Sequence, residues 1–414
     1  MVPRRWDSRG LGRLGAVDGG PEVTRVTETA ARPSTVTGIR DLVREVASSV
    51  VADQAEELDR EGMWPREAMQ ALGDAGLLGL NVAAASGGHG QGMLALAVAT
   101  EELGRVCGST GLVFGMHCVA SKVIEVRATE DQRARYLAPI AAGEHVTSLA
   151  LSEPGTGVHF YLPRATFRRE GEGFVVNGHK SFVTSGGHAD SYVASVVAEH
   201  ADLDPGTFSC LVVDRDTPGA SWTHAWDGLG MRGNSSCSLL LEDAEVPAGN
   251  LLGAEGDETW YLFEVIAPYF IVAMTGTYLG IARGAVEATV EHLRKRVYSH
   301  TGEQVGASET VAHRLGEVWA GVERTRQLLH HAARLGDAGD PAARAALFAS
   351  KAEVADTATW VVNEAMTLTG GRAYASNSVL ARALRDVRAA HVMAPSTDLL
   401  KTWLGRSLLD LPLL

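Results

Sequence analysis

The most specific signal in the sequence comes from two polar, glycine-rich stretches: residues 150–157, Ala-Leu-Ser-Glu-Pro-Gly-Thr-Gly, and residues 177–187, Asn-Gly-His-Lys-Ser-Phe-Val-Thr-Ser-Gly-Gly. Each follows or contains a short apolar run and ends in hydroxyls and glycines, which indicates the end of a strand. Two such strand ends offer backbone N–H groups and hydroxyls to a flat heteroaromatic ring, while Phe182 offers an aromatic face. This pattern is suitable for lining a flavin, although glycine-rich strand ends on their own are usually turns.

The regions around these stretches predict an α+β protein in three parts. Apolar residues at helical spacing, such as Ile39, Val43 and Val46, indicate a helical domain over residues 37–145. β-Branched or alternating runs at 191–198, 208–213 and 238–241 indicate a β domain over residues 146–250. The helical period returns over residues 251–414, whereas residues 1–36 have no period and are predicted to be a disordered tail. This order is not the βαβ alternation of a Rossmann protein.

Composition narrows the classes of function. The 414 residues are 45% hydrophobic, with 37 Lys and Arg against 50 Asp and Glu, a net charge of −13. Such an acidic chain is not expected to bind nucleic acid. Its four scattered cysteines do not form a disulfide framework, and no export signal is seen, so we expect a cytoplasmic protein. The uncharged run 265–282 is interpreted as a buried bundle helix rather than a membrane insertion, and no metal-binding motif is found.

With these motifs in this order, the chain resembles the acyl-CoA dehydrogenase superfamily over roughly residues 37–410. Besides the two stretches above, the resemblance rests on six shorter motifs: Glu101-Glu102-Leu103-Gly104-Arg105, Leu229-Gly230-Met231-Arg232-Gly233, Glu242-Asp243-Ala244-Glu245-Val246-Pro247, Asn250-Leu251-Leu252-Gly253, Leu368-Thr369-Gly370-Gly371 and Arg385-Asp386-Val387-Arg388. The resemblance implies an N-terminal helical domain, a middle β-barrel-like domain and a C-terminal four-helix bundle.

The resemblance also implies FAD, held at a subunit interface of a homotetramer or homodimer, with an electron-transfer flavoprotein as a possible partner. Carried over residue by residue, Leu151 and Ser152 meet the flavin pyrimidine, and Phe182 and Thr184 meet the ring near N5. Gly157 belongs to the loop beside the cofactor. Arg296 and the pair Gly370–Gly371 belong to motifs that reach the FAD of a neighbouring subunit. Gly157 is followed by Val158-His159 where the family has Ser-Asp.

The sequence departs from the family at the catalytic base. In the family, a glutamate takes the α-proton of an acyl thioester while flavin N5 takes the β-hydride. The first position for that glutamate is Ala394 here, and the alternative position on the long helix is Phe270. A base must lie close to the proton and be able to accept it. His391, Asp398 and Tyr269 are therefore the candidates for a relocated base.

Three functions remain open. The first is a flavin dehydrogenase that oxidises the Cα–Cβ bond of an acyl thioester, on CoA or on a carrier protein. The second is a flavin monooxygenase on the same fold, which needs no α-proton base. The third is a catalytically altered, non-redox member of the superfamily. The Ser-Glu-Pro loop and the Phe-Val-Thr-Ser-Gly-Gly hairpin favour the first function.

Overall fold

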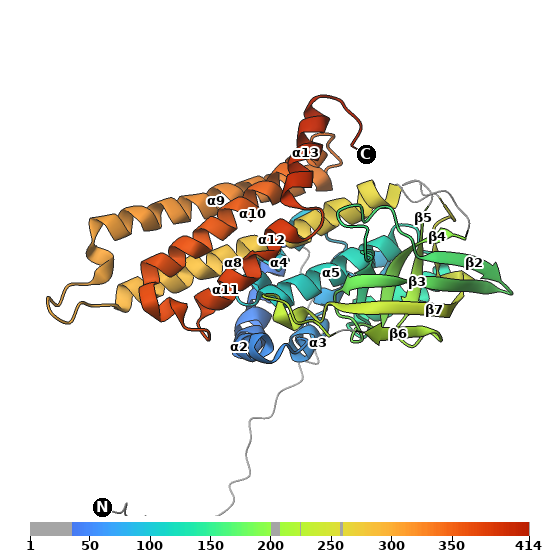
Figure 1. Ribbon diagram of the computed structural model, residues 1–414, viewed down its shortest axis with the longest axis horizontal. Coiled ribbons are helices and arrows are strands. Elements are labelled where there is room, and N and C mark those ends of the chain that lie inside the picture. Colours follow the sequence, from blue (N-terminus) through green and yellow to red (C-terminus); the bar gives the residue numbers. More distant parts are fainter. Residues whose placement is uncertain (1–34, 200–207, 224, 257–259, 414) are drawn as a thin grey trace, which may run out of the picture. The chain divides into compact units, whose positions relative to one another are not determined.

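The computed structural model describes residues 35–199, 208–223, 225–256 and 260–413 of the 414-residue chain. All but the last two residues of the tail predicted at 1–36 therefore lie outside the described residues. Residues 33–414 form one compact unit, and the description that follows concerns this unit (Figure 1).

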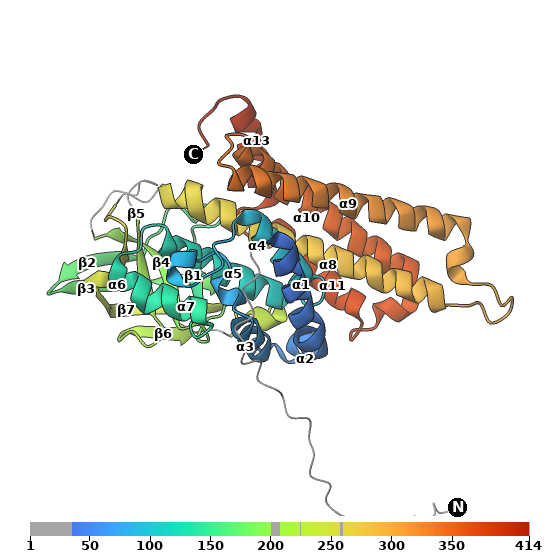
Figure 2. The ribbon, with the colours of Figure 1, turned by 180° about the vertical axis from the view of Figure 1, so that it is seen from behind.

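The first part of the unit is helical, as predicted. α1 begins where the Thr35 hydroxyl accepts the N–H of Gly38, and it turns Ile39 and Val43 into the core. Nearly every residue of α4 and α5 is buried, so these two helices are enclosed by other elements (Figure 2). The described helices of this part are α1 (Val36–Val46), α2 (Ala52–Glu61), α3 (Arg66–Asp74), α4 (Met93–Gly104), α5 (Gly108–Glu125), α6 (Glu130–Gln132) and α7 (Ala138–Ala142).

The middle part is an eight-stranded sheet with the order β6-β7-β3-β2-β4-β5-β8, in which β1 pairs with β4. The strands are β1 (Thr147–Ala150), β2 (Thr166–Glu170), β3 (Gly173–Val183), β4 (Ser191–Ala198), β5 (Phe208–Asp214), β6 (Ala220–Thr223), β7 (Cys237–Pro247) and β8 (Leu251–Leu252). β1 and β4 are parallel, with Thr147 opposite Ser191, and β3 is antiparallel to both β2 and β7. α5 packs against β1 and so joins the helices to the sheet.

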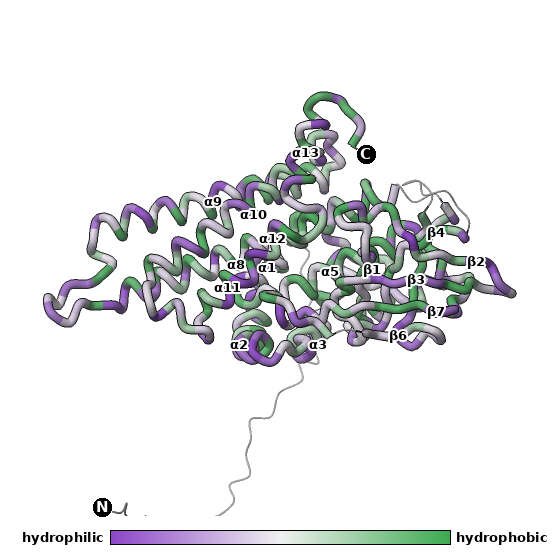
Figure 3. The backbone as a smooth tube through the Cα atoms, in the orientation of Figure 1, coloured by the Kyte–Doolittle hydropathy of each residue, from purple (hydrophilic) through white to green (hydrophobic). Residues whose placement is uncertain are grey.

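The last part is a bundle of long helices. Its members are α8 (Ala267–Lys295), α9 (Glu309–Asp337), α10 (Ala343–Thr369), α11 (Val379–Val387), α12 (Ala389–Val392) and α13 (Thr397–Leu408). α8 continues a π-helical turn, and together they form one helix, Tyr261–Lys295, that is long and apolar enough to span a membrane. Its most apolar window is 83% buried inside the unit, so it is a central helix of the bundle. Hydrophilic residues instead recur along the outer helix α9 in Figure 3.

α4 and α8 pack at very short range because glycines replace side chains where they meet. A Cβ atom on Gly276 would lie 2.1 Å from the Thr100 hydroxyl, and one on Gly280 would lie 2.2 Å from the Glu101 carbonyl. On the facing side, a Cβ atom on Gly104 would lie 2.3 Å from a backbone oxygen of α8. The helical part before the sheet and the bundle after it therefore share one core.

A buried charge network closes this contact. The Glu101 carboxylate of α4 meets Arg283 of α8 and, on α9, Arg326 Nε at 2.8 Å and His330 Nε2 at 3.0 Å. Although burial opposes it, the His330 hydrogen bond and the two guanidinium groups lower the pKa of Glu101 to about 2. Glu101 is thus ionised and joins three helices.

Candidate active site

The fold brings the two glycine-rich stretches together. One follows β1 and the other includes the end of β3, and the Ser181 N–H donates a 2.7 Å hydrogen bond to the Ser152 carbonyl. Leu151 and Ser152 therefore lie beside the segment that contains Phe182 and Thr184. This is the arrangement of strand ends that the sequence predicted for a flat ring.

A buried ion pair locks the two stretches to each other. Lys180 Nζ lies 2.6 Å from Glu153 Oε1 and also donates to the Ser195 carbonyl of β4, and both charged side chains are buried. The Glu153 carboxylate accepts the backbone N–H groups of Arg164 and Ala165 at 2.7 and 3.0 Å, which ties both ends of the intervening loop. Burial lowers the pKa of the Lys180 ammonium, and the Glu153 carboxylate opposes this shift.

Phe182 presents a surface that the protein itself leaves open, whereas Thr184, two residues further along, is buried. Phe182 has φ = 55° at an irregularity in the β3–β7 pairing, and 67% of the residue is exposed, with only an edge contact to Trp226. The Thr184 hydroxyl has no hydrogen-bond partner among the described residues, although the residue is 5% exposed. Strained backbone beside an open aromatic face and a free hydroxyl is typical of ligand sites, and this set fits the isoalloxazine ring of a flavin.

One support of this hairpin escaped the sequence analysis. Trp64, which precedes α3, donates from Nε1 to the Ser185 hydroxyl at 3.0 Å and stacks on His188 with ring centroids 5.1 Å apart. Ser185 has φ = 61°, so the hairpin ends in a second left-handed residue. Since 121 residues separate Trp64 from Ser185, no local pattern signals the contact.

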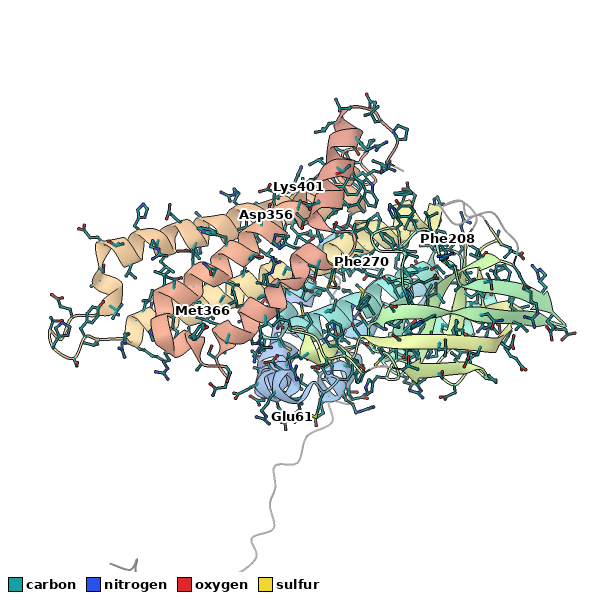
Figure 4. The ribbon with its side chains drawn as sticks, in the orientation of Figure 1. Glu61, Phe208, Phe270, Asp356, Met366 and Lys401 are labelled. Atoms are coloured by element: carbon teal, nitrogen blue, oxygen red, sulfur yellow. The ribbon has the colours of Figure 1, made fainter. Side chains whose placement is uncertain are left out.

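The other predicted cofactor residues lie apart from this pair of strand ends. Gly157, with φ = 54°, is exposed in the loop between β1 and β2, where His159 Nδ1 contacts the Tyr161 hydroxyl at 2.6 Å. Arg296 caps the C-terminal end of α8, and Gly370–Gly371 follow α10; both places are exposed. The end of α10 that Met366 marks in Figure 4 lies away from the sheet, so within one chain these glycines do not join the Phe182 surface.

The candidate bases occupy three different environments. Tyr269 is buried at the start of α8, burial raises the pKa of its phenol, and its ring lies 5.9 Å from Lys122 Nζ. It is therefore protonated at neutral pH. Asp398 is exposed in the first turn of α13.

His391 is half-buried and points at α10. Its Nε2 lies 3.0 Å from Asp356 Oδ1, and its Nδ1 lies 3.4 Å from the Thr359 hydroxyl. Lys401 Nζ reaches the other oxygen of Asp356 at 2.7 Å, and both residues are labelled in Figure 4. Although partial burial opposes it, hydrogen bonds from Lys401 and His391 lower the pKa of Asp356, so the imidazole is held by an ionised carboxylate.

A cavity of about 580 Å³ lies beside the alternative base position. Ala267 and Ile271 line it from the start of α8, directly next to Phe270, Phe263 lines it from the π-helical turn before α8, and Leu347 and Phe348 line it from α10. The Arg344–Glu264 ion pair, at 3.2 Å, is also part of its wall. None of the predicted cofactor residues lines this cavity.

A helical part, a sheet and a helical bundle, with a cradle for a flat ring where β1 and β3 end, define a three-part flavoprotein. The chain belongs to the acyl-CoA dehydrogenase family: the N-terminal, middle and C-terminal domains of acyl-CoA dehydrogenase match residues 35–144, 148–244 and 272–409. The predicted superfamily and fold are thereby confirmed.

Named relatives agree with this membership. The cyclohex-1-ene-1-carbonyl-CoA dehydrogenase of Geobacter metallireducens is 33% identical over 89% of this chain and 96% of its own length. The short-chain acyl-CoA dehydrogenase of Clostridium acetobutylicum is 30% identical over 88% of this chain and 95% of its own. An acyl-CoA dehydrogenase structure from Geobacillus kaustophilus, 27% identical, superimposes with a TM-score of 0.83 over 90% of this chain and 97% of its own.

Family membership fixes the general activity. The chain is an oxidoreductase of the acyl-CoA dehydrogenase type, a flavin enzyme of acyl thioesters, and its cofactor is FAD. The residues present fit that cofactor, since the Phe182 surface and the Thr184 hydroxyl are available to a flat ring.

Proposed function

We propose that this protein oxidises the Cα–Cβ bond of an acyl group carried as a thioester on CoA or on a carrier protein. FAD, when bound, supplies the hydride acceptor for this chemistry. The observation that supports the proposal is the Ser181–Ser152 hydrogen bond, which brings the stretch that contains Leu151 next to the stretch that contains Phe182 and Thr184. The relatives named for cyclohexene-carbonyl-CoA and short-chain acyl-CoA dehydrogenation support a thioester substrate.

We further propose that the proton acceptor is not a carboxylate at either family position. Ala394 and Phe270 carry no ionisable group, so the α-proton must leave by another route. His391 is the residue to test first, because Asp356 holds its Nε2 and thereby fixes the orientation of the imidazole. Asp398 and Tyr269 are weaker candidates: one is exposed to water, and burial raises the pKa of the other.

The apolar residues of the 580 Å³ cavity, which share its wall with the Arg344–Glu264 ion pair, support a place for the hydrophobic part of the substrate. The cavity borders Phe270 on α8, the position where some family members keep their base.

The assembly is also a proposal. Arg296 and the Gly370–Gly371 turn are exposed at the end of the bundle, near an apolar groove of about 570 Å³ between α8 and α9 that is lined by Leu293, Leu315 and Trp319. If a second copy packed on this groove, Arg296 and the two glycines of the first copy would lie near the FAD of the second copy. We therefore propose a cytoplasmic homodimer or homotetramer that passes electrons to an electron-transfer flavoprotein.

The loss of both glutamates favours one alternative, a flavin monooxygenase on the same fold. One experiment separates the two. The purified FAD-loaded protein is mixed anaerobically with a panel of acyl-CoA thioesters and with acylated carrier protein, and the flavin absorbance is followed. Bleaching by a thioester supports the dehydrogenase. The monooxygenase replaces the dehydrogenase if no thioester bleaches the flavin and if the chemically reduced flavin then consumes oxygen rapidly and hydroxylates one of the offered acyl compounds.

A further inference from the structure

The bundle contains a buried lysine with no role in the site described so far. Lys351 lies on α10, is 1% exposed, and directs its ammonium group at a single short segment. Its Nζ donates to the carbonyl oxygens of Ala390 and Pro395, both at 2.8 Å, and of Met393 at 3.3 Å. One side chain thus satisfies three backbone acceptors within six residues.

This lysine is not part of an ion pair. Among the described residues, no carboxylate lies within ion-pair distance of Lys351, and Asp356, further along α10, contacts His391 and Lys401 instead. Burial alone lowers the pKa of Lys351 to about 7. Keeping an amino group in such a place is costly, so a lysine here indicates that its three hydrogen bonds matter.

Besides Lys351, the segment is held by the His391 side chain, which contacts Asp356 and Thr359 of α10. α12 has four residues, and the carbonyl groups at a helix end have no partners within the helix. The chain then crosses Met393, Ala394 and Pro395 before the Ser396 hydroxyl caps α13. On the opposite side, the Tyr278 hydroxyl of α8 contacts Met393 Sδ at 2.8 Å. The segment is therefore fixed between α10 and α8, by its backbone at Lys351 and by the side chains of His391 and Met393.

We propose that Lys351 is a positioning residue for the reaction: its three hydrogen bonds fix the backbone of residues 390–395 and so set the wall of the active site at Ala394. The proposal rests on the proposed function, in which His391 of this segment is the first candidate for the base. Because Ala394 carries only a methyl group, the position of its backbone sets where this part of the segment lies. A displacement of about 1 Å at a reacting centre is enough to lower a rate roughly a hundredfold.

The test compares three variants of the full-length, FAD-loaded protein with the wild type. Lys351→Met keeps the apolar stem and removes all three donors, whereas Lys351→Gln keeps two N–H donors on a shorter stem. Ser350→Ala is the matched control, because Ser350 is equally buried on α10 but bonds only to the Leu347 carbonyl of its own helix. Each protein is reduced anaerobically with the acyl-CoA thioester that bleaches the wild type fastest.

We expect the reduction rate constant per bound flavin, at saturating thioester, to fall roughly ten- to a hundredfold in Lys351→Met. Lys351→Gln falls in between, and Ser350→Ala matches the wild type. The thioester dissociation constant changes little, and backbone hydrogen exchange accelerates in residues 389–396. A rate per bound flavin within twofold of the wild type in Lys351→Met overturns the proposal, even if that variant melts earlier. Where Lys351→Met does not accumulate as a folded protein, Lys351→Gln is judged by the same criterion.

The design separates this proposal from the proposed function. If no thioester reduces the wild-type flavin, the proposed function fails, and hydrogen exchange alone decides on Lys351. Faster exchange confined to residues 389–396 then supports the fixing of the segment by Lys351, and unchanged exchange in that segment overturns it.

Discussion

The buried Lys180–Glu153 pair offers the sharpest test of how the cofactor cradle is held. In Lys180→Met, the Glu153 carboxylate stays buried with only the Arg164 and Ala165 N–H groups as partners. Breaking one half of a buried ion pair costs about 3–5 kcal/mol, since the remaining charge is left uncompensated. For a chain of this length, that loss corresponds to a fall in Tm of about 5 °C.

The measurement is thermal and urea unfolding at a fixed FAD concentration. Lys295→Met is the control, because Lys295 and Glu291 pair on the surface with 75% and 66% of their side chains exposed, and such pairs contribute roughly 0.5 kcal/mol. The double variant Glu153→Gln/Lys180→Met removes both charges and recovers a large part of the free energy of unfolding that Lys180→Met loses. If Lys180→Met and Lys295→Met are equally stable, the pair does not hold the two strand ends together and this reasoning is wrong.

Three further predictions concern single residues. Glu101→Gln removes a carboxylate whose folded pKa of about 2 is below its unfolded value. The free energy of unfolding of the wild type therefore falls by about 3 kcal/mol more than that of the variant as the pH falls from 5 to 2. Acid unfolding curves of the two proteins measure this difference. Asp386 accepts the Met231 N–H at 2.6 Å, and burial raises its folded pKa to about 6. The wild type therefore loses stability as the pH rises from 4 to 6, and Asp386→Asn does not. Unfolding measured at both pH values will show the variant gaining stability relative to the wild type. Phe182→Ala leaves protein stability within about 0.5 kcal/mol because the ring is exposed, but it weakens FAD binding at least tenfold, which flavin titration measures.

Each of these predictions has a contrary result. Parallel acid unfolding curves for Glu101→Gln and the wild type would mean that the network does not lower the pKa of Glu101. A stability difference for Asp386→Asn that is independent of pH would mean that the buried carboxyl group titrates normally. Unaltered FAD affinity in Phe182→Ala would remove this ring from the cofactor site.

Local patterns predicted the elements that have a clear run of β-branched or uncharged residues. The β-branched run 191–198 is β4, and the uncharged run 265–282 lies in a buried helix. β2 and β6 were not predicted, because Thr-Phe-Arg-Arg-Glu and Ala-Ser-Trp-Thr are short and largely polar. The parallel pairing of β1 with β4 joins segments 44 residues apart, and no local period encodes it.

The site residues likewise fall into those that local motifs predicted and those that depend on long-range contacts. The neighbouring positions of Ser152 and Phe182 could be expected from two motifs of similar character. The left-handed backbone of Phe182, the Trp64 support and the Lys351 contacts could not, because each depends on chain segments brought together only by folding. The identity of the base stays a prediction for the same reason: distance to the α-proton is a tertiary property.

The glycine-lined contact between α4 and α8 has a consequence for synthesis on the ribosome. α4 is buried on nearly all sides, but the helix that covers it begins about 160 residues later in the chain. At roughly 5–20 residues per second, the nascent protein waits about 8–30 s with the side of α4 that faces α8 uncovered. During this interval it is a substrate for chaperones rather than a folded domain, and a truncated chain that ends at the sheet would stay in that state.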